Sequence, residues 1–436
     1  MNRTALGRMF ILIPLLTAVL AFGSTEKVLY SFKGGSDGGE PGGMVLDKSG
    51  NLYGAAETGG RGGNINCFGN GCGFVYQLAP IAGGGWKKTN LYSFTGKDDG
   101  GVPVGNLAID AKGNLYGVTE QGGTGDCSTV LGAGCGVVFR LSPNSKGKWD
   151  YKVIWNFGEN SDGDDGNYPN AGVVFDKAGN LYGTTTFGGS FVCDCGIVYQ
   201  LKPLSGGTWM ENVLYLFEGI SQGGTDVSFP DSDVFVDAKG NIFGTGTGGG
   251  DVNCNDGCGG VFELIPQSGG SYKEKVLHVF TGGRDGFQPE GGVLADSAGN
   301  LYGTTLYGGG STGCNNGSFG CGTVFELRKS AKGYRENIIF RFDGQDGYKP
   351  DADLTLDSKN RLYGTTYNGG ADNSGIVFMF STKAGKWKES ILYSFSGGQD
   401  GYGPDAVLTN DGKGGFFSNT AFGGTAGQGT VFQLLP

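Results

Sequence analysis

The sequence predicts an all-β fold, a seven-bladed β-propeller of four-stranded blades, and two observations support this. The stretch Gly291–Thr305 (GGVLADSAGNLYGTT) recurs along the chain every 54 to 66 residues, and such a period is typical of repeat architectures. Each unit holds four short runs rich in Val, Ile, Leu, Tyr and Phe, separated by glycine-rich breaks rather than by helical patterns. The Asn-Leu-Tyr-Gly signature or its variant begins at Asn51, Asn114, Asn180, Asn241, Asn300, Arg361 and Gly415.

The fifth unit shows how one blade is expected to form. Gly292–Ala295 and Leu301–Thr305 are joined by a short Asp-Ser-Ala-Gly-Asn turn and predict a hairpin. Thr323–Leu327 and Tyr334–Phe342 predict the third and fourth strands. Four strands repeated seven times fit a propeller, whereas a parallel β-helix, the alternative, has much shorter turns. The turn Asp-x-x-Gly-Asn, or a variant of it, starts at Asp47, Asp110, Asp176, Asp237, Asp296, Asp357 and Asp411.

The two ends of the repeat array predict how the ring closes. The last unit stops after its third strand, Thr430–Leu434, while the chain's first strand-like run, Lys27–Phe32 (KVLYSF), matches fourth strands such as Ile391–Phe395 (ILYSF). We therefore expect the N-terminal strand to complete the last blade, which removes the exposed sheet edges of an open array. An aromatic residue opens each of the other fourth strands and is expected to pack between blades: Trp86, Trp149, Trp209, Tyr272, Tyr334 and Trp387.

Residues 1–23 have the pattern of a signal peptide. Arg3 and Arg8 precede the apolar run Met9–Leu20, and Ala21-Phe22-Gly23 supplies a small-residue cleavage site. The apolar run is too short for a spanning helix. We expect residues 24–436 to form one domain that is secreted, periplasmic or at the cell surface, without a membrane span, and monomeric.

The remaining chain is acidic. Without its first 23 residues it carries 30 basic and 42 acidic residues, a net charge of −12. Such a surface repels phosphate backbones and anionic lipids, so we expect neither nucleic acid nor membrane-surface binding.

The ten cysteines form five closely spaced pairs, each between the second and third strands of one of the first five units. In an exported chain this pattern favours disulfides that staple long loops. Zinc is the alternative, but it needs four convergent ligands at characteristic spacing. Cys193 and Cys195 are the weakest pair because a ring closed over one residue is strained. The pairs are Cys67 with Cys72, Cys127 with Cys135, Cys193 with Cys195, Cys254 with Cys258, and Cys314 with Cys321.

A second motif, Asp-x-x-x-Pro, precedes the first strand of every unit, on the face that carries the cysteine loops. A turn made by Asp and fixed by Pro explains all seven copies. The alternative is a ring of carboxylates near the channel mouth that binds a ligand. No cofactor is expected, with calcium as the alternative and Asn160–Gly166 (NSDGDDG) as its best local candidate. The seven aspartates are Asp37, Asp99, Asp165, Asp226, Asp285, Asp346 and Asp400.

Two classes of function remain open. The only histidine, His278, lies in the apolar run VLHVF, so a Ser-His-Asp or Cys-His site is not credible, and we assign no catalytic residue. The first hypothesis is a non-catalytic propeller whose loop face binds an extracellular protein, polysaccharide or cell-wall component. The second is a carbohydrate-active enzyme, a hydrolase or lyase, that uses acidic residues at the channel mouth.

The units, which follow the pattern GNLYGTT…GG…GxVFxL…ILYSF, resemble the GloVer tandem repeat family of exported bacterial proteins over residues 26–436. That resemblance implies export and a repeat array, and it offers no ligand or catalytic residue to carry over. The half-unit made of the Asp turn and GNLY is similar to NHL-type propeller repeats, which implies a four-stranded blade.

Overall fold

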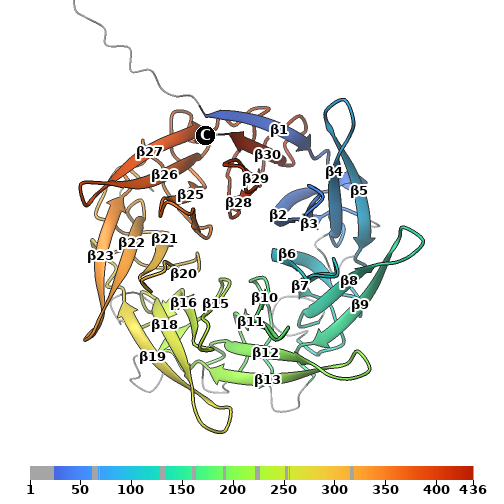
Figure 1. Ribbon diagram of the computed structural model, residues 1–436, viewed down its shortest axis with the longest axis horizontal. Coiled ribbons are helices and arrows are strands. Elements are labelled where there is room, and N and C mark those ends of the chain that lie inside the picture. Colours follow the sequence, from blue (N-terminus) through green and yellow to red (C-terminus); the bar gives the residue numbers. More distant parts are fainter. Residues whose placement is uncertain are drawn as a thin grey trace, which may run out of the picture.

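The chain folds into a ring of seven four-stranded antiparallel sheets (Figure 1), so the expected propeller is confirmed. The computed structural model describes residues 24–60, 67, 69–127, 134–159, 164–189, 193–220, 226–250, 254, 256–314 and 319–435. The expected signal peptide, residues 1–23, lies outside these ranges. Within them, the only helix is the short 3₁₀ turn η1 (Gly35–Asp37), and none is long and apolar enough to cross a membrane.

Each blade runs from an inner strand at the centre of the ring to an outer strand at its rim. The inner strands are β2 (Gly39–Leu46), β6 (Gly101–Ile109), β10 (Val174–Phe175), β15 (Phe235–Val236), β20 (Leu294–Ala295), β24 (Thr355–Leu356) and β28 (Thr409–Asn410). The second strands are β3 (Leu52–Thr58), β7 (Leu115–Gln121), β11 (Leu181–Thr185), β16 (Ile242–Gly246), β21 (Leu301–Thr305), β25 (Leu362–Thr366) and β29 (Phe416–Thr420).

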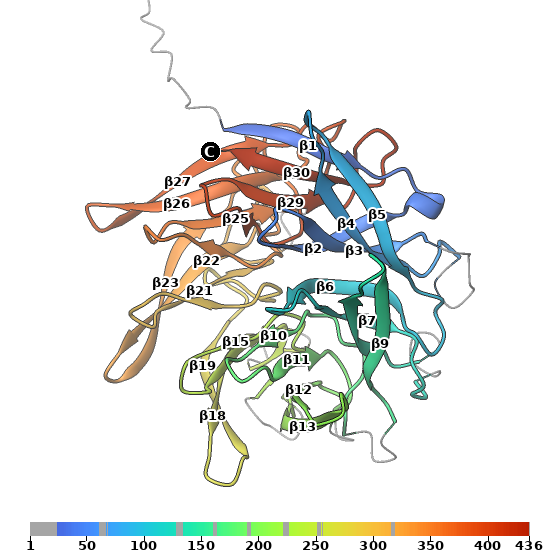
Figure 2. The ribbon, with the colours of Figure 1, turned by 45° about the vertical axis from the view of Figure 1, so that its right-hand side comes forward.

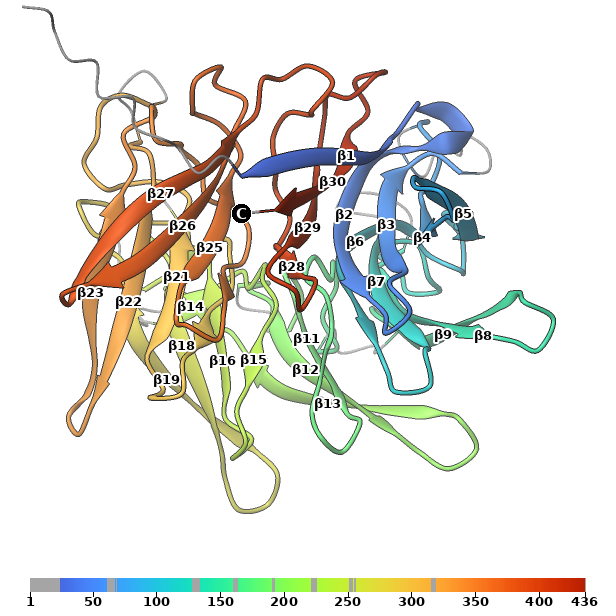
Figure 3. The ribbon, with the colours of Figure 1, turned by 45° about the horizontal axis from the view of Figure 1, so that its top comes forward.

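The third and outer strands form longer hairpins that splay outward from the ring (Figure 1 and Figure 3). The third strands are β4 (Phe74–Pro80), β8 (Val137–Pro143), β12 (Ile197–Pro203), β18 (Gly260–Pro266), β22 (Thr323–Ser330), β26 (Ile376–Lys383) and β30 (Thr430–Leu435). The outer strands are β5 (Trp86–Ser93), β9 (Trp149–Asn156), β13 (Trp209–Leu216), β19 (Tyr272–Val279), β23 (Gly333–Arg341), β27 (Lys386–Ser394) and β1 (Thr25–Ser31). The fourth blade adds a small pair, β14 (Val227–Ser228) with β17 (Gly248–Gly249).

The ring closes as the sequence predicts. Strand β1 pairs antiparallel with β30, from Thr25 opposite Leu435 to Ser31 opposite Thr430, and becomes the outer strand of the seventh blade. The two strands lie side by side in all three ribbon views (Figure 1, Figure 2 and Figure 3). Residues from the two ends of the chain therefore share one sheet.

In the fifth blade the second strand has the predicted bounds, but the first is shorter than expected. Strand β20 covers only Leu294–Ala295 because the preceding backbone turns away from β21. The N–H of Gly292 donates instead to Asp353 Oδ1 of the next blade, at 2.5 Å. The early part of the inner segment thus joins neighbouring blades instead of extending its own sheet.

A phenylalanine at the end of each outer strand packs between blades. All seven are fully buried, and each ring contacts an aromatic ring of the next blade's third strand with centroids 5.1 to 5.5 Å apart. These contacts repeat the same core around the ring. The pairs are Phe32–Tyr76, Phe94–Phe139, Phe157–Tyr199, Phe217–Phe262, Phe280–Phe325, Phe342–Phe378 and Phe395–Phe432.

A proline and a glycine form a second repeated contact between blades. The proline of each Asp-x-x-x-Pro motif packs on the glycine that precedes the third strand of the blade before it. That glycine has a positive φ, and a Cβ on it would lie 2.4 to 2.8 Å from the proline Cδ, so no other residue fits. The pairs are Gly73–Pro103, Gly136–Pro169, Gly196–Pro230, Gly259–Pro289, Gly322–Pro350, Gly375–Pro404 and Gly429–Pro41.

The aromatic residues that open the outer strands also pack between blades, as expected. The ring centroid of Trp149 lies 5.6 Å from that of Tyr53 in the preceding blade, and the centroids of Trp387 and Tyr302 lie 6.0 Å apart. The Asp-x-x-Gly-Asn turns hold the hairpins between the first two strands. Asp47 is typical, because its Oδ1 accepts bonds from the N–H groups of Ser49 and Asn51 at 2.8 Å each.

Replacing Phe280 by alanine tests the repeated core. Its side chain is fully buried against Phe325, so we expect Phe280→Ala to lower the free energy of unfolding by about 3–5 kcal/mol. Ile81→Ala, at an exposed side chain, serves as the control and is expected to change it by less than about 0.5 kcal/mol. Denaturant melts of both variants would measure the difference, and equal midpoints would contradict the assignment.

Candidate functional site

The seven aspartates of the Asp-x-x-x-Pro motif lie in the loops that lead from each outer strand to the next blade. Four of them, Asp37, Asp99, Asp226 and Asp400, accept a hydrogen bond from an outer-strand tyrosine hydroxyl at 2.6 to 3.3 Å. The others accept backbone N–H groups of their own loops: Asp165 from Glu159, Asp285 from Thr281 and Asp346 from Asp343. Their side chains fix the loops beside the outer strands, and the central cavity is lined by other residues.

Asp165 also belongs to the calcium candidate Asn160–Gly166. Residues 160–163 of that stretch lie outside the described residues, and the Asp165 side chain is buried.

The ten cysteines lie in the five expected pairs on the loop face. Their Cα–Cα distances of 5.1 to 5.3 Å are within the range that a disulfide spans. The weakest pair by sequence, Cys193 with Cys195, has the same Cα separation as the others, at 5.2 Å. The other four pairs are Cys67 with Cys72, Cys127 with Cys135, Cys254 with Cys258, and Cys314 with Cys321.

The second cysteine of each pair does more than close a loop. It is buried, and its backbone carbonyl accepts a hydrogen bond, at 2.9 to 3.2 Å, from the residue that precedes the proline in the next blade. In the two units without cysteines, Ser374 and Gln428 supply the same carbonyl. The backbone at this position therefore links neighbouring blades, with or without a cysteine pair. The bonds run from Val102 to Cys72, Tyr168 to Cys135, Phe229 to Cys195, Gln288 to Cys258 and Lys349 to Cys321.

The residues that donate these bonds have a left-handed backbone. Glu40, Val102, Tyr168, Phe229, Gln288 and Lys349 have φ between 52° and 62°, and Gly403 takes the position in the seventh blade. Non-glycine residues rarely adopt this conformation, and such outliers cluster where a structure positions a site. Each one directs the residue after the proline into the centre of the ring.

The centre of the ring holds a cavity of about 340 Å³ whose lining includes eight acidic side chains. Four of them follow the motif proline in four consecutive blades: Asp231, Glu290, Asp351 and Asp405. Two more, Asp233 and Asp353, lie two residues further along the same segments, and Glu40 and Glu57 add carboxylates from the first blade. We call this set the channel acids.

The channel acids shift each other's ionisation. Burial and the neighbouring Asp231 raise the pKa of Glu290 to about 7, with Lys349 opposing. Burial and Glu40 raise the pKa of Asp405 to about 7, and burial with Asp405 and Glu290 raises the pKa of Asp351 well above its usual range. One oxygen of Asp351 is buried without a hydrogen-bond partner. A cation in this cavity would relieve the repulsion and favour the ionised acids.

At the cavity the inner segments of different blades approach each other closely. Asn106 of the second blade donates its side-chain N–H to Asp233 of the fourth blade at 3.0 Å, across the centre. A Cβ on Gly172 would lie 2.4 Å from the Asn106 carbonyl oxygen, so only glycine fits there. Asn106 and Asp233 both line the cavity, so this hydrogen bond joins two of its walls.

Aromatic side chains gather in the loops of the third to seventh blades. Tyr367 and Phe422 line the acidic cavity, while Phe287, Tyr307 and Phe319 line a second cavity of about 670 Å³. Phe319 and Phe422 are the most exposed, at 55% and 38%. The rings form local clusters with centroids 5.3 to 6.2 Å apart: Tyr168–Phe187–Phe229, Phe287–Tyr307–Phe319 and Tyr367–Tyr402–Phe422. We call them the aromatic arc.

Sequence reasoning did not single out the channel acids, although a signal was present. The position after the motif proline reads Gly42, Val104, Asn170, Asp231, Glu290, Asp351 and Asp405. It varies between repeats, whereas the proline directly before it is the same in all seven. A position that varies within an otherwise regular repeat is a candidate for a binding site, and this one could have been singled out on that ground.

A second set of acids lies at the blade junctions. In five of the seven, a glutamate of the outer strand approaches the loop aspartate of the preceding junction, and one oxygen of that glutamate is buried without a hydrogen-bond donor. Burial raises the pKa of Glu26 to about 7, of Glu389 to about 8 and of Glu211 to about 9, with the neighbouring aspartate adding to each shift. The five are Glu26, Glu211, Glu274, Glu336 and Glu389.

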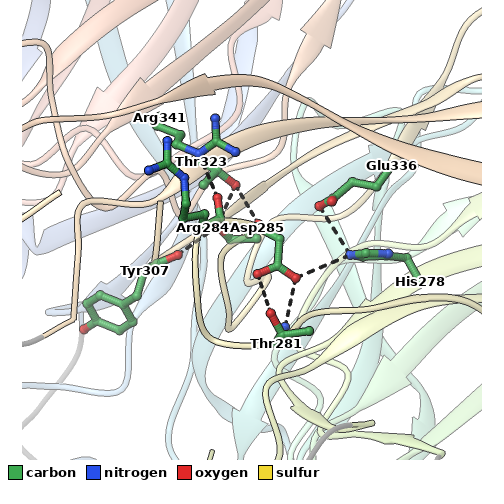
Figure 4. A network of polar contacts seen from close by, with 9 residues as sticks. His278, Thr281, Arg284, Asp285, Tyr307, Thr323, Glu336 and Arg341 are labelled. Carbon is green, nitrogen blue, oxygen red and sulfur yellow. Dashed lines mark hydrogen bonds and ion pairs between the residues drawn. The ribbon is translucent and has the colours of Figure 1, made fainter. Parts of the chain in front are cut away.

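The described residues contain one group that combines histidine with carboxylates at metal-ligand spacing. His278, Asp285 and Glu336 bring one ligand atom each to within 4.8 Å of the others (Figure 4).

Comparisons with known proteins identify the repeat and the fold. A model of the Gloeobacter/Verrucomicrobia repeat family matches residues 127–315 and 311–436. No curated protein sequence matches the chain.

Among solved structures, the chain is similar to a Bacteroides uniformis protein provisionally assigned as a 6-phosphogluconolactonase. The identity is 11%, the TM-score is 0.47, and the match covers 79% of this chain and 84% of that one. It is also similar to a Thermus thermophilus protein provisionally assigned as an oxidoreductase (glucose dehydrogenase), with 14% identity, a TM-score of 0.42 and coverage of 95% and 100%. Both TM-scores are below 0.5, and we take no activity from them.

The junction acids predict that stability falls as the pH rises. The folded chain holds the Glu211 proton up to about pH 9, whereas an unfolded glutamate loses it near 4.5. The contribution is therefore complete below about pH 4.5 and is lost as the pH rises to 9. We expect Glu211→Gln, which stays neutral, to reduce the fall in melting temperature between pH 5 and pH 9, measured in EDTA. Glu218→Gln, at an exposed loop position, should keep the original slope; identical slopes for both variants would refute the shift.

Proposed function

This chain belongs to the Gloeobacter/Verrucomicrobia repeat family, and we propose that it is an exported, non-catalytic binding propeller that captures ligands bearing positively charged amino groups. The channel acids and the aromatic arc on the loop face would form the binding site. Such groups occur in amino sugars of extracellular polysaccharides and in lysine-rich protein segments. The signal-peptide pattern of residues 1–23 and the five cysteine pairs support export.

The observation that carries this proposal is the unneutralised acidity of the cavity. Acids from five different blades converge there, and the lining residues include no lysine or arginine. An amino group that enters would pair with several carboxylates at once, and charges beside the protein interior attract more strongly than in bulk water. Aromatic faces at the rim would add cation–π contacts and apolar area.

A carbohydrate-active enzyme is the second candidate, and one observation favours it. Glu290 and Asp405, with pKa values near 7, flank Asp351 in the same cavity. A carboxylic acid that keeps its proton near neutral pH beside other carboxyl groups is the arrangement that glycoside hydrolysis uses.

Binding to charge-matched ligands tests the first function. We expect the chain to bind a chitosan oligosaccharide or an oligolysine peptide, and to bind neither the N-acetylated chitin oligosaccharide of equal length nor alginate. Tighter binding of chitosan would indicate a polysaccharide ligand, and tighter binding of oligolysine would indicate a protein ligand. Affinity for oligolysine, measured by calorimetry, should rise between pH 5 and pH 8, because the channel acids lose their protons over that range. Affinity that does not respond to ligand charge would contradict the proposal.

Neutral isosteres locate the site. The double variant Glu290→Gln, Asp351→Asn should weaken cationic binding at pH 8 by at least about tenfold, since two charge pairs in the cavity are lost. Asp150→Asn is the matched control, because this exposed side chain lies on an outer hairpin and its loss should leave affinity unchanged. Equal loss in both variants would remove the channel as the site.

Product analysis separates the two candidates. Incubation of the same polysaccharides with the chain should give no new reducing ends and no unsaturated products by mass spectrometry. Products that disappear in the double variant would establish the enzyme instead.

A further inference from the structure

We propose that His278, Asp285 and Glu336 bind a divalent transition-metal ion, such as zinc, that joins the fourth blade to the fifth. The site is separate from the channel and does not depend on the proposed function. His278 lies on outer strand β19, Asp285 in the loop that follows it, and Glu336 on outer strand β23 (Figure 4). Nε2 of His278 is 3.3 Å from Oε1 of Glu336 and 4.0 Å from Oδ2 of Asp285.

These distances suit a tetrahedral metal after small side-chain rotations. Zinc with bonds of about 2.1 Å sets neighbouring ligands about 3.4 Å apart. The loop already fixes one ligand, because Thr281 donates its backbone N–H and its hydroxyl to Asp285, at 3.0 and 2.7 Å. Side chains held in this way keep their orientation when the metal arrives. Three protein ligands leave the fourth position to a water molecule.

One other junction shows that this position accommodates a positive charge. In the junction that closes the ring, Lys88 occupies the place of Glu336, and its ammonium group lies 2.9 Å from Oδ1 of the loop aspartate, Asp37. Tyr30 occupies the place of His278 and donates its hydroxyl to the same carboxylate at 2.6 Å. There the cation is part of the chain. Where Glu336 replaces the lysine, two carboxylates and an imidazole meet instead.

The two closest ligand atoms of this cluster face each other at 3.3 Å without a hydrogen bond, a contact that a metal would bridge. His278 Nε2 and Glu336 Oε1 are both buried without a hydrogen-bond partner. In the described part of the chain no lysine or arginine pairs with Asp285 or Glu336; the nearby Arg341 donates its Nε–H to the Arg284 carbonyl at 2.8 Å. In Figure 4 both guanidinium groups lie on the opposite side of Asp285 from the imidazole.

The ligand types select the class of metal. One imidazole with two carboxylates suits zinc and its first-row neighbours, whereas calcium takes six to eight oxygen ligands. Among the five junctions with a glutamate, only this one adds a histidine, so we assign the metal here alone. Asp285, which the sequence analysis interpreted as a turn residue with ligand binding as the alternative, would have both roles at this junction.

The test is zinc titration of the purified chain without a histidine tag, by calorimetry and by metal analysis after gel filtration. We expect one zinc per chain. Since His278 is the only histidine, its two imidazole ¹⁵N resonances report this site alone, and the Nε2 signal should shift on zinc addition. No retained zinc, or unmoved imidazole signals, would overturn the proposal.

Two variants keep the fold and remove the site. His278→Tyr introduces the residue found at this position in four other junctions, and Glu336→Lys reproduces the Lys88 pairing. Both should weaken zinc binding at least about tenfold and abolish any rise in melting temperature with zinc, while melting in EDTA stays cooperative. Asp150→Asn should bind zinc like the original chain. Unchanged stoichiometry in His278→Tyr would place the metal elsewhere and refute the assignment.

Discussion

The contact between each motif proline and the glycine of the preceding blade is the constraint on which the rest of this ring depends. It brings together a left-handed residue, whose conformation costs about 1–2 kcal/mol in a non-glycine residue, a proline and a glycine without room for a side chain. The cost is offset because the left-handed residue donates its N–H to a carbonyl of the neighbouring blade, and because the adjoining phenylalanine contact is fully buried. The same contact turns the next residue toward the channel.

The sequence predicted the features that recur in every blade, but it did not reveal the site formed by residues that differ between blades. Gly259, Pro289 and Phe280 recur in every unit because each junction needs the same backbone and the same buried ring, so a period of about 60 residues indicates blades, closure and strand order. The channel acids are different. Glu290 follows a repeated proline but is itself not repeated. The secondary-structure propensities of the sequence do not indicate that the seven positions after the prolines meet at one place. Convergence depends on ring closure, which only the three-dimensional fold provides.

The motif aspartates are the opposite case. Their seven-fold recurrence favoured a turn, with a ring of ligands as the alternative, and side chains such as Asp37 and Asp400 are held by tyrosine hydroxyls of the outer strands. Because an aspartate occurs at this position in every blade, its role is one that every blade shares, namely to hold the loop between neighbouring blades. A ligand has no sevenfold symmetry, so its binding site is better sought at positions that differ between blades. The acids after the motif proline, from Asp231 to Asp405 in four blades, and His278 are such positions.

The two sets of acids follow from one physical problem, solved differently at each place. A buried carboxylate needs a proton, a cation or hydrogen-bond donors. At the ring-closing junction Lys88 supplies a cation from the chain, and at Glu211 a raised pKa retains a proton. At Glu336 the available partner is an imidazole whose lone pair a metal could use, and in the channel the chain supplies no lining cation at all. The acids that no lysine or arginine of the chain neutralises are therefore the places where we propose that an external cation binds.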